Sequence, residues 1–266
     1  MRILLTGCHG FIGRNVNDEL MEREDVDSVI CIEKDYMNYE GWKSSLVKVV
    51  QESDAIIHVG AISDTMLKDP NEMMKYNFEF SRVLFNMAEY YNKKVVYSSS
   101  AANKGDGGST PSNLYGWSKY IAEKYGVSKV SQFVALRYFN VYGPGEQNKG
   151  KMASVAFQSH RLGKFKLFPG NPKRDFVYIK DVVSATLYPI FNDVLPGVYE
   201  VGSGTARTFE DVLNLMGVPY KYRDDNEVPN GYQFYTKANK NEFMDGWEPI
   251  YNLEKGLTEY REYLES

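Results

Sequence analysis

Short apolar runs alternate along the first half of the chain with longer stretches of helical periodicity. The apolar runs predict strands at residues 3–5, 28–32, 54–58, 94–98 and 133–137. The stretches between them predict helices at residues 11–23, 71–91 and 112–127. Strands and helices in this alternation are typical of βαβ units, whose right-handed crossovers cover both faces of a parallel sheet. The pattern therefore predicts an α/β fold with a doubly wound parallel sheet.

The pattern changes after residue 143, where turn-forming glycines and prolines become frequent. Helices are predicted in this half at residues 152–162, 181–191, 208–216 and 253–264. We expect residues 1–143 to form one domain and residues 144–266 a smaller lobe, with some segments of the lobe able to return to the main sheet.

A glycine-rich turn joins the first predicted strand to the first predicted helix. Gly7 permits a tight turn, Gly10 lets a pyrophosphate approach the backbone, and Gly13 allows the helix to pack closely. The free N–H groups of the helix N-terminus attract phosphate. Because the motif follows a strand and begins a helix, it predicts a dinucleotide site, with Phe11 and Ile12 beside the cofactor.

The choice between NAD and NADP depends on the end of the second strand. Glu33 lies 20 residues beyond Gly13, where a carboxylate can bind the adenosine ribose and repel a 2′-phosphate. Lys34 or Arg14 would favour NADP instead if one of them paired with that phosphate. If both are solvated surface charges, they favour neither cofactor. The sequence leaves both cofactors open, with a preference for NAD.

Ser100, Tyr115 and Lys119 form the candidate catalytic group. Tyr115 and Lys119 are four residues apart on a predicted helix, which places their Cβ atoms about 5–6 Å from each other on one face. A nearby ammonium and a positive nicotinamide ring stabilise a phenolate, so Tyr115 can act as a base closer to neutral pH. Ser100 can hydrogen-bond the reacting oxygen. Tyr-x-x-x-Lys alone also occurs on solvated helix faces, so this interpretation depends on the glycine-rich turn.

These motifs resemble the NAD-dependent epimerase/dehydratase family. The segments that carry the resemblance are 6–13, 58–61, 97–101, 115–119 and 137–144. The resemblance implies a Rossmann-type dinucleotide-binding domain with bound NAD or NADP, followed by a substrate-binding lobe. It implies a catalytic triad of Ser100, Tyr115 and Lys119, in which Lys119 also holds the nicotinamide ribose. The further residues that it places at the cofactor or the sugar nucleotide are His58, Gly60, Ala61, Asn77 and Asn140.

The second half of the chain is similar to the ADP-glycero-manno-heptose 6-epimerases, a narrower group. The matching segments are 149–157, 173–178 and 231–233. This resemblance implies a second acid/base lysine at Lys149. Inverting a carbinol centre means removing a hydride, exposing the other face of the carbonyl and returning the hydride. Proton-transfer groups on different sides, Tyr115 and Lys149, make this possible. A plain loop lysine is the alternative for Lys149.

Two residues are candidates for binding the substrate nucleotide. Arg174 could hold its pyrophosphate through bidentate hydrogen bonds, or stabilise the lobe by pairing with Asp175. Tyr232 could close over the nucleotide or lie in the core. The chain departs from the family pattern in a short loop after Ser100 and in Gly145 and Gly231, which stand where arginines are common. These departures argue against an identical substrate.

Composition excludes several other classes of function. The formal net charge is −4 with no long basic run, which disfavours nucleic-acid binding. No stretch approaches the about 20 apolar residues of a membrane span, and the first apolar run is too short for a signal peptide. We therefore expect a cytoplasmic protein. Cys8 and Cys31 do not indicate a disulfide framework, and the three scattered histidines offer no metal-ligand spacing.

The leading hypothesis is thus a nucleotide-sugar epimerase that acts by transient hydride transfer, most like the heptose 6-epimerases. The alternative is a 4-epimerase or reductase on a UDP-, GDP- or dTDP-sugar. A dehydratase is disfavoured because Ala101 and Ala102 occupy the place of its acid/base pair. A non-catalytic NAD(P)-binding protein would have no need of the intact triad. The resemblance also implies a homo-oligomer.

Overall fold

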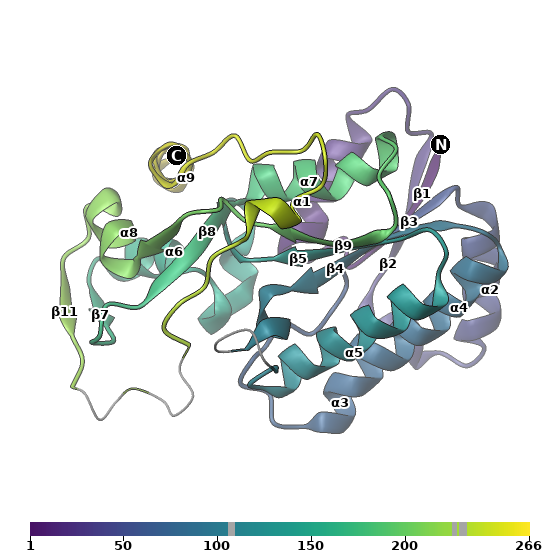
Figure 1. The fold of residues 1–266 in the computed structure, drawn as a ribbon, viewed down its shortest axis with the longest axis horizontal. Helices are drawn as coiled ribbons and strands as arrows, with labels where there is room; N and C mark the ends of the chain where they lie inside the picture. The colour runs from purple at the N-terminus through teal and green to yellow at the C-terminus, as the bar shows by residue number, and fades with distance from the viewer. Residues whose placement is uncertain (106–109, 225–227, 229–232) are drawn as a thin grey trace.

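The computed structural model describes residues 1–105, 110–224, 228 and 233–266, and its centre is a parallel sheet (Figure 1). Within these residues, six strands pair in parallel in the order β2-β1-β3-β4-β5-β9. They are β1 (Arg2–Thr6), β2 (Ser28–Ile32), β3 (Ala55–His58), β4 (Lys94–Ser100), β5 (Phe133–Tyr138) and β9 (Gly197–Val201). The strand order reverses between β1 and β3, which opens a crevice at their carboxyl ends. The predicted doubly wound α/β fold is confirmed.

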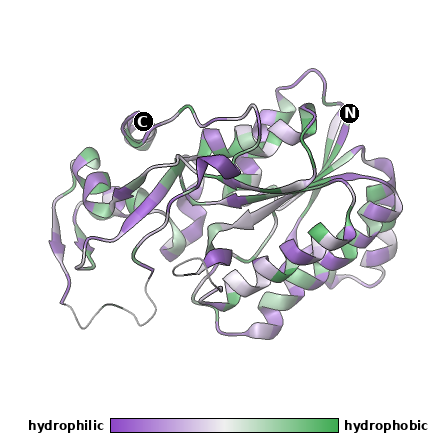
Figure 2. Cartoon of the chain, in the orientation of Figure 1, coloured by the Kyte–Doolittle hydropathy of each residue, from purple (hydrophilic) through white to green (hydrophobic). Residues whose placement is uncertain are grey.

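Helices cover both faces of this sheet because its strands are apolar on both sides. Ile3 and Leu5 pack toward one face and Leu4 toward the other, as the alternation of side chains along a strand requires. One face carries α1 (Phe11–Met21) and α7 (Ile179–Phe191), and the other carries α2 (Trp42–Glu52), α4 (Phe80–Tyr90) and α5 (Leu114–Lys129). Figure 2 shows hydrophilic and hydrophobic residues alternating around these helices.

The second half of the chain builds a smaller lobe beside the sheet. Its centre is β8 (Lys173–Tyr178), which pairs in parallel with β6 (Asn140–Tyr142) and antiparallel with β10 (Ala206–Thr208). The remaining elements are β7 (Phe165–Leu167), β11 (Tyr220–Tyr222), α6 (Val155–Leu162), α8 (Phe209–Met216) and α9 (Leu253–Glu265). The boundary expected at residue 143 is crossed in both directions. Strand β6 precedes it but pairs with β8 of the lobe, whereas β9 follows it and pairs within the main sheet, on which α7 packs.

The structure differs from the sequence prediction in two helical regions. The expected helix at residues 71–91 is divided into α3 (Pro70–Met74), a π-helical turn at Lys75–Glu79 and α4. The helix α2 was not predicted at all. Its buried side chains are only Leu46 and Val50, so its apolar stripe is too narrow to stand out in the sequence.

The two cysteines correct another expectation. Cys8 and Cys31 form a disulfide whose Cα atoms are 5.9 Å apart. The parallel register pairs Leu5 of β1 with Cys31 of β2, so the turn that follows β1 carries Cys8 against β2. A separation of 23 residues along the chain does not reveal this contact, because it depends on strand order.

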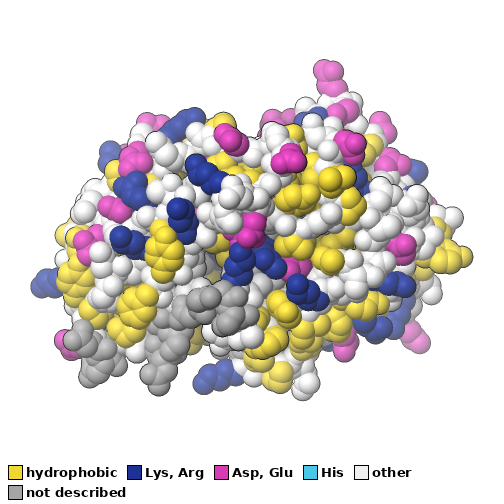
Figure 3. All heavy atoms as spheres, viewed as in Figure 1, with side chains coloured by type: hydrophobic (Ala, Val, Ile, Leu, Met, Phe, Trp, Pro, Cys, Tyr) yellow, Lys and Arg dark blue, Asp and Glu magenta, His cyan; other side chains and the backbone are white. Residues whose placement is uncertain are grey.

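The outer surface carries charged side chains of both signs. Basic and acidic side chains are interspersed over the face drawn in Figure 3, which carries no extended basic surface. Within the described part of the chain, no helix is both long and apolar enough to cross a bilayer.

Candidate active site

A cleft of about 1150 Å³ opens where the carboxyl ends of the main strands meet the lobe. It is lined from the sheet side by the turns after β1, β3 and β4, and from the other side by the lobe. The predicted site residues that line it are Gly7, Gly10, Phe11, Ile12, Gly13, Glu33, Lys34, Gly60, Ala61, Ser100, Tyr115, Lys119, Asn140, Lys149 and Arg174. Residues as far apart in the sequence as Gly7 and Arg174 thus line one cleft.

The glycine-rich turn forms the floor of the cleft at β1, α1 and β3. Gly7 has a φ of +74°, and a Cβ atom there would lie 2.6 Å from the Cα of Gly60. A Cβ atom on Gly13 would lie 1.9 Å from the carbonyl oxygen of Gly7. Only glycine permits these approaches. The helix α1 begins at Phe11 with no side-chain cap, so its first N–H groups can hold a pyrophosphate. This cradle fits a dinucleotide.

The acidic end of β2 favours NAD over NADP. The Glu33 carboxylate lines the cleft and accepts a hydrogen bond of 2.8 Å from the backbone N–H of His9 in the glycine-rich turn. Lys34 pairs with Glu72 at 2.9 Å and lies over the Tyr76 ring, so its charge is already compensated. A 2′-phosphate would therefore meet the Glu33 carboxylate.

The candidate catalytic group is assembled where α5 meets the end of β4. A Cβ atom on Gly116 would lie 2.8 Å from the carbonyl oxygen of Ala102, so the glycine lets the first turn of α5 approach the turn after Ser100. This brings the Ser100 hydroxyl near the Tyr115 phenol in the cleft. Burial raises the pKa of Tyr115, and the nearby Ser100 side chain opposes this by lowering it.

Lys119 lies one helical turn beyond Tyr115 and is almost completely buried. Its Nζ atom is 4.3 Å from the centre of the Tyr97 ring and 3.4 Å from the Ser98 hydroxyl. Burial lowers the pKa of Lys119 to about 7, although the negative charge of Glu123 raises it. Near neutral pH this lysine can carry a positive charge, and such a charge stabilises a neighbouring phenolate.

Lys149 reaches the cleft from the lobe. It belongs to a 3₁₀-helical segment, Glu146–Met152, and its Nζ atom lies 5.1 Å from the centre of the Phe11 ring. Burial lowers the pKa of Lys149, and the charge of Glu146 opposes the shift. Glu146 itself is buried and closes the segment, since its carboxylate accepts hydrogen bonds from Gly143 at 3.3 Å and from the Ser154 hydroxyl at 2.7 Å. The sequence analysis missed Glu146.

Comparison with known proteins agrees with this geometry. The model of the NAD dependent epimerase/dehydratase family matches residues 3–202, which is most of the chain. This chain belongs to that family. A curated relative, the ADP-L-glycero-D-manno-heptose-6-epimerase of Brachyspira hyodysenteriae, is 32% identical over 99% of this chain and 98% of its own. The family assignment confirms the predictions of an epimerase-type enzyme and of NAD as its cofactor.

Two solved structures are close in fold. The ADP-L-glycero-D-manno-heptose-6-epimerase of Helicobacter pylori has a TM-score of 0.84 and 28% identity, and the alignment covers 100% of this chain and 96% of that one. The UDP-glucose 4-epimerase of Thermotoga maritima, solved with UDP-glucose, has a TM-score of 0.80 and 25% identity over 100% and 99% of the two chains.

Two residues that the family resemblance placed at the cofactor lie behind the cleft wall. His58 is buried between the hydroxyls of Thr6 at 2.7 Å and Ser81 at 2.8 Å, and burial lowers its pKa to about 3. Asn77, in the π-helical turn before α4, hydrogen-bonds the backbone of Ile62. Both side chains brace the turns that line the cleft and are absent from its described lining.

Arg174 lines the cleft from the lobe. This side chain is buried, donates to the carbonyl oxygens of Lys173 and Gln233, and lies 5.7 Å from the centre of the Phe209 ring. Asp175 accepts hydrogen bonds from the Ser203 hydroxyl and from the backbone N–H groups of Gly204 and Ala238. Tyr232 lies outside the described residues. No group of residues that could hold a metal ion occurs in the part of the chain that the structure describes.

Proposed function

We propose that this chain is a nucleotide-sugar epimerase that acts by transient hydride transfer to bound NAD, most like the ADP-glycero-manno-heptose 6-epimerases. The observation that carries the proposal is the meeting of Ser100, Tyr115 and Lys119 in the cleft whose floor is the glycine-rich turn. A protein that only bound NAD would need the cradle and Glu33, but it would have no use for a buried phenol one helical turn from a buried lysine and near a serine hydroxyl.

Tyr115 is the proposed acid/base for one epimer. NAD, when bound, supplies the carbon that takes up a hydride and gives it back. Tyr115 accepts the proton of the substrate hydroxyl as its carbon loses the hydride, and Ser100 hydrogen-bonds the same oxygen. Lys119 favours the phenolate through its positive charge and holds the nicotinamide ribose. Since the hydride returns in the second half of the reaction, the cofactor ends as it began.

Lys149 is the proposed acid/base for the other epimer. Two observations support this role: its Nζ atom lies over the Phe11 ring at the start of α1, and burial lowers its pKa. It approaches the cleft from a different element than Tyr115 does, so it can serve the carbonyl after its other face has turned toward the cofactor. Arg174 and Asn140 are the proposed contacts of the sugar nucleotide, with Tyr232 as a third.

A 4-epimerase acting on another nucleotide sugar is the second candidate. It is favoured by Gly145, which has a φ of +96° and leaves no side chain where an arginine is common in the family. It is also favoured by the short loop after Ser100. The similarity to a UDP-glucose 4-epimerase of known structure adds to this candidate.

The test is to incubate the purified chain with ADP-D-glycero-D-manno-heptose and, separately, with UDP-glucose, and to follow each sugar by NMR. We expect inversion at C6 of the heptose. Inversion of UDP-glucose at C4 with an unchanged heptose would support the second candidate. Inversion of neither sugar, with NAD bound, would refute both.

The proposal extends to the setting of the enzyme. We propose a cytoplasmic homo-oligomer, the first because its substrate and cofactor are intracellular metabolites and the second from the family resemblance. In a reducing compartment Cys8 and Cys31 would be held as thiols. Cell fractionation tests the proposed location, and light scattering of the purified protein tests the proposed oligomeric state.

A further inference from the structure

A buried carboxylate lies behind the candidate catalytic group and takes no part in the mechanism above. Glu123 follows Lys119 by four residues on α5, just as Lys119 follows Tyr115. Its side chain is fully buried and does not line the cleft. Arg137 of β5 donates to both of its oxygens, with distances of 2.9 and 2.6 Å. A buried charge that is paired in this bidentate way fixes the relative position of α5 and β5.

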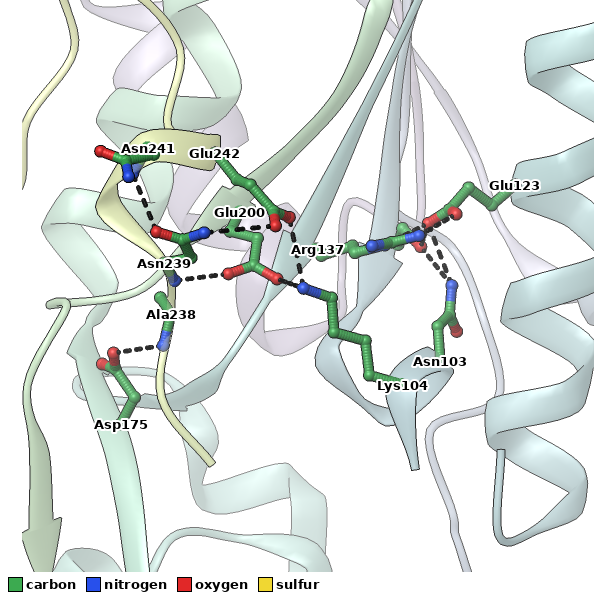
Figure 4. Close-up of polar contacts among 11 residues, drawn as sticks. Asn103, Lys104, Glu123, Arg137, Asp175, Glu200, Ala238, Asn239, Asn241 and Glu242 are labelled. Carbon is green, nitrogen blue, oxygen red and sulfur yellow. Dashed lines mark hydrogen bonds and ion pairs between the residues drawn. The ribbon is translucent and has the colours of Figure 1, made fainter. Parts of the chain in front are cut away.

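The same carboxylate is bonded to both sides of Ser100. The hydroxyl of Ser99 donates to Glu123 at 2.6 Å. The amide of Asn103, in the 3₁₀ turn that follows Ser100, donates to Glu123 at 3.0 Å and to Ser99 at 2.9 Å. Figure 4 shows Asn103 and Arg137 converging on Glu123 from different elements. The residue before Ser100 and the turn after it are therefore both attached to α5, the helix that carries Tyr115.

The turn after Ser100 is also attached to the second half of the chain. Lys104 forms ion pairs with Glu200 of β9 and with Glu242, the latter at 3.2 Å (Figure 4). Asn239 donates its backbone N–H to Glu200 at 2.6 Å. The short turn that the sequence analysis treated as a departure from the family is thus held at two consecutive residues, Asn103 and Lys104.

The charge of Glu123 also acts on Lys119. The ionisable groups that face Lys119 are Tyr97, His58, Tyr115 and Glu123. His58 is neutral near pH 7 because its pKa is lowered to about 3, and the two tyrosines are uncharged there because burial raises their pKa values. Among these groups, Glu123 is therefore the one whose negative charge raises the pKa of Lys119 and so favours its protonated form.

We propose that Glu123 is a positioning residue: with Asn103 and Arg137 it holds the segment that carries Ser100 against the helix that carries Tyr115, and it places a negative charge one helical turn from Lys119. The proposal rests on the catalytic roles proposed above for Ser100, Tyr115 and Lys119. Glu123 acts through these residues and touches neither the substrate nor the cofactor. A role in folding alone would predict lower stability without a change in the geometry or titration of the catalytic group.

The first test removes the tie to the turn and leaves the Glu123–Arg137 pair intact. In Asn103→Ala, we expect kcat to fall about 10-fold, a modest share of a general acid–base contribution, while KM and the Kd for NAD stay within about twofold. A crystal structure should show the Ser100 hydroxyl displaced relative to the Tyr115 phenol. Unchanged kcat and an unchanged position of Ser100 would overturn the proposal.

The second test needs no sugar and so separates this proposal from the proposed function. In Glu123→Gln, the pKa of Lys119, followed by NMR of ¹³Cε-labelled lysine and assigned with Lys119→Met, should fall by about one unit, as loss of a charge one helical turn away implies. Asp181→Asn is the control, since Asp181 is a buried carboxylate in α7 that accepts from Ile250 and Tyr251. It should leave the Lys119 titration unchanged.

An unchanged pKa of Lys119 in Glu123→Gln, or an equal shift in Asp181→Asn, would overturn the electrostatic part of the proposal. Should Glu123→Gln fail to fold, Asn103→Ala decides the positioning part. If the wild-type chain inverts no nucleotide sugar, the proposed function fails, whereas the Lys119 titration still decides the role of Glu123.

Discussion

The buried ammonium group of Lys119 should make the wild-type protein less stable than a variant with an uncharged side chain at this position. Its side chain is 2% exposed, and burial lowers its pKa from 10.5 to about 7. In the unfolded chain the lysine keeps its proton up to pH 10.5, so folding at neutral pH must desolvate or deprotonate the ammonium. At 1.36 kcal/mol per pKa unit, this costs about 4 kcal/mol at pH 7 and about 2 kcal/mol at pH 9.

The sign of the pH dependence follows from proton binding. Between pH 7 and pH 10.5 the unfolded state binds more protons at this site than the folded state, so the free energy of unfolding rises with pH in this window. Lys119→Met removes the effect. The variant also loses the contact with Ser98 and the approach to the Tyr97 ring, which offset part of the gain by about 1–2 kcal/mol. We expect Lys119→Met to be more stable than the wild type by about 2 kcal/mol at pH 7.

Urea unfolding of the cofactor-free protein at pH 7 and at pH 9 measures this. The difference in stability between variant and wild type should shrink by about 2 kcal/mol between the two pH values, and the packing contributions cancel in that comparison. Lys124→Met, on the exposed side of the same helix, is the matched control and should show no such change. A Lys119→Met protein that is no more stable than the wild type at pH 7, with a gap that does not depend on pH, would refute the reasoning.

Three further substitutions test the site. Tyr115→Phe should lower kcat by at least about 100-fold, the scale of a general acid–base group, with an unchanged Kd for NAD; turnover like that of the wild type would remove Tyr115 from the mechanism. Lys149→Ala should lose inversion and keep NAD binding in a fluorescence titration, and retained inversion would leave a single acid/base. Glu33→Gln keeps a hydrogen-bond acceptor for His9 but loses the charge, so the Kd for NADP should fall about 10-fold relative to NAD; an unchanged ratio would contradict the NAD preference assigned to Glu33.

The main sheet and the catalytic group could be predicted because their determinants are local. Each strand of the main sheet before residue 143 is a run of apolar residues, and the glycine-rich turn follows the first of them. Tyr115 and Lys119 are four residues apart on one helix, so their proximity needs no knowledge of the tertiary structure. The membership of β9 in the main sheet is different, because it pairs with β5 from some 60 residues away and is fixed only by packing.

What the sequence could not reveal depends on contacts among several elements. The partners of Glu123 come from β4, the turn after Ser100 and β5, and no single segment marks them. One local hint existed, since Glu123 continues the four-residue spacing of Tyr115 and Lys119. The direction of the His58 side chain could not be predicted from the sequence either, because the strand that carries it is buried on both faces. Only the hydrogen bonds with Thr6 and Ser81 show that its ring points into the core.

In the proposed mechanism, the inverted carbon loses and regains the same hydrogen through NAD. Inversion run in D₂O and analysed by NMR tests this directly with ADP-D-glycero-D-manno-heptose as the substrate. We expect a product with no deuterium at the inverted carbon, because the hydride never exchanges with solvent. Full deuterium incorporation at that carbon would mean removal of a proton instead, and would contradict the roles given to NAD, Tyr115 and Lys149.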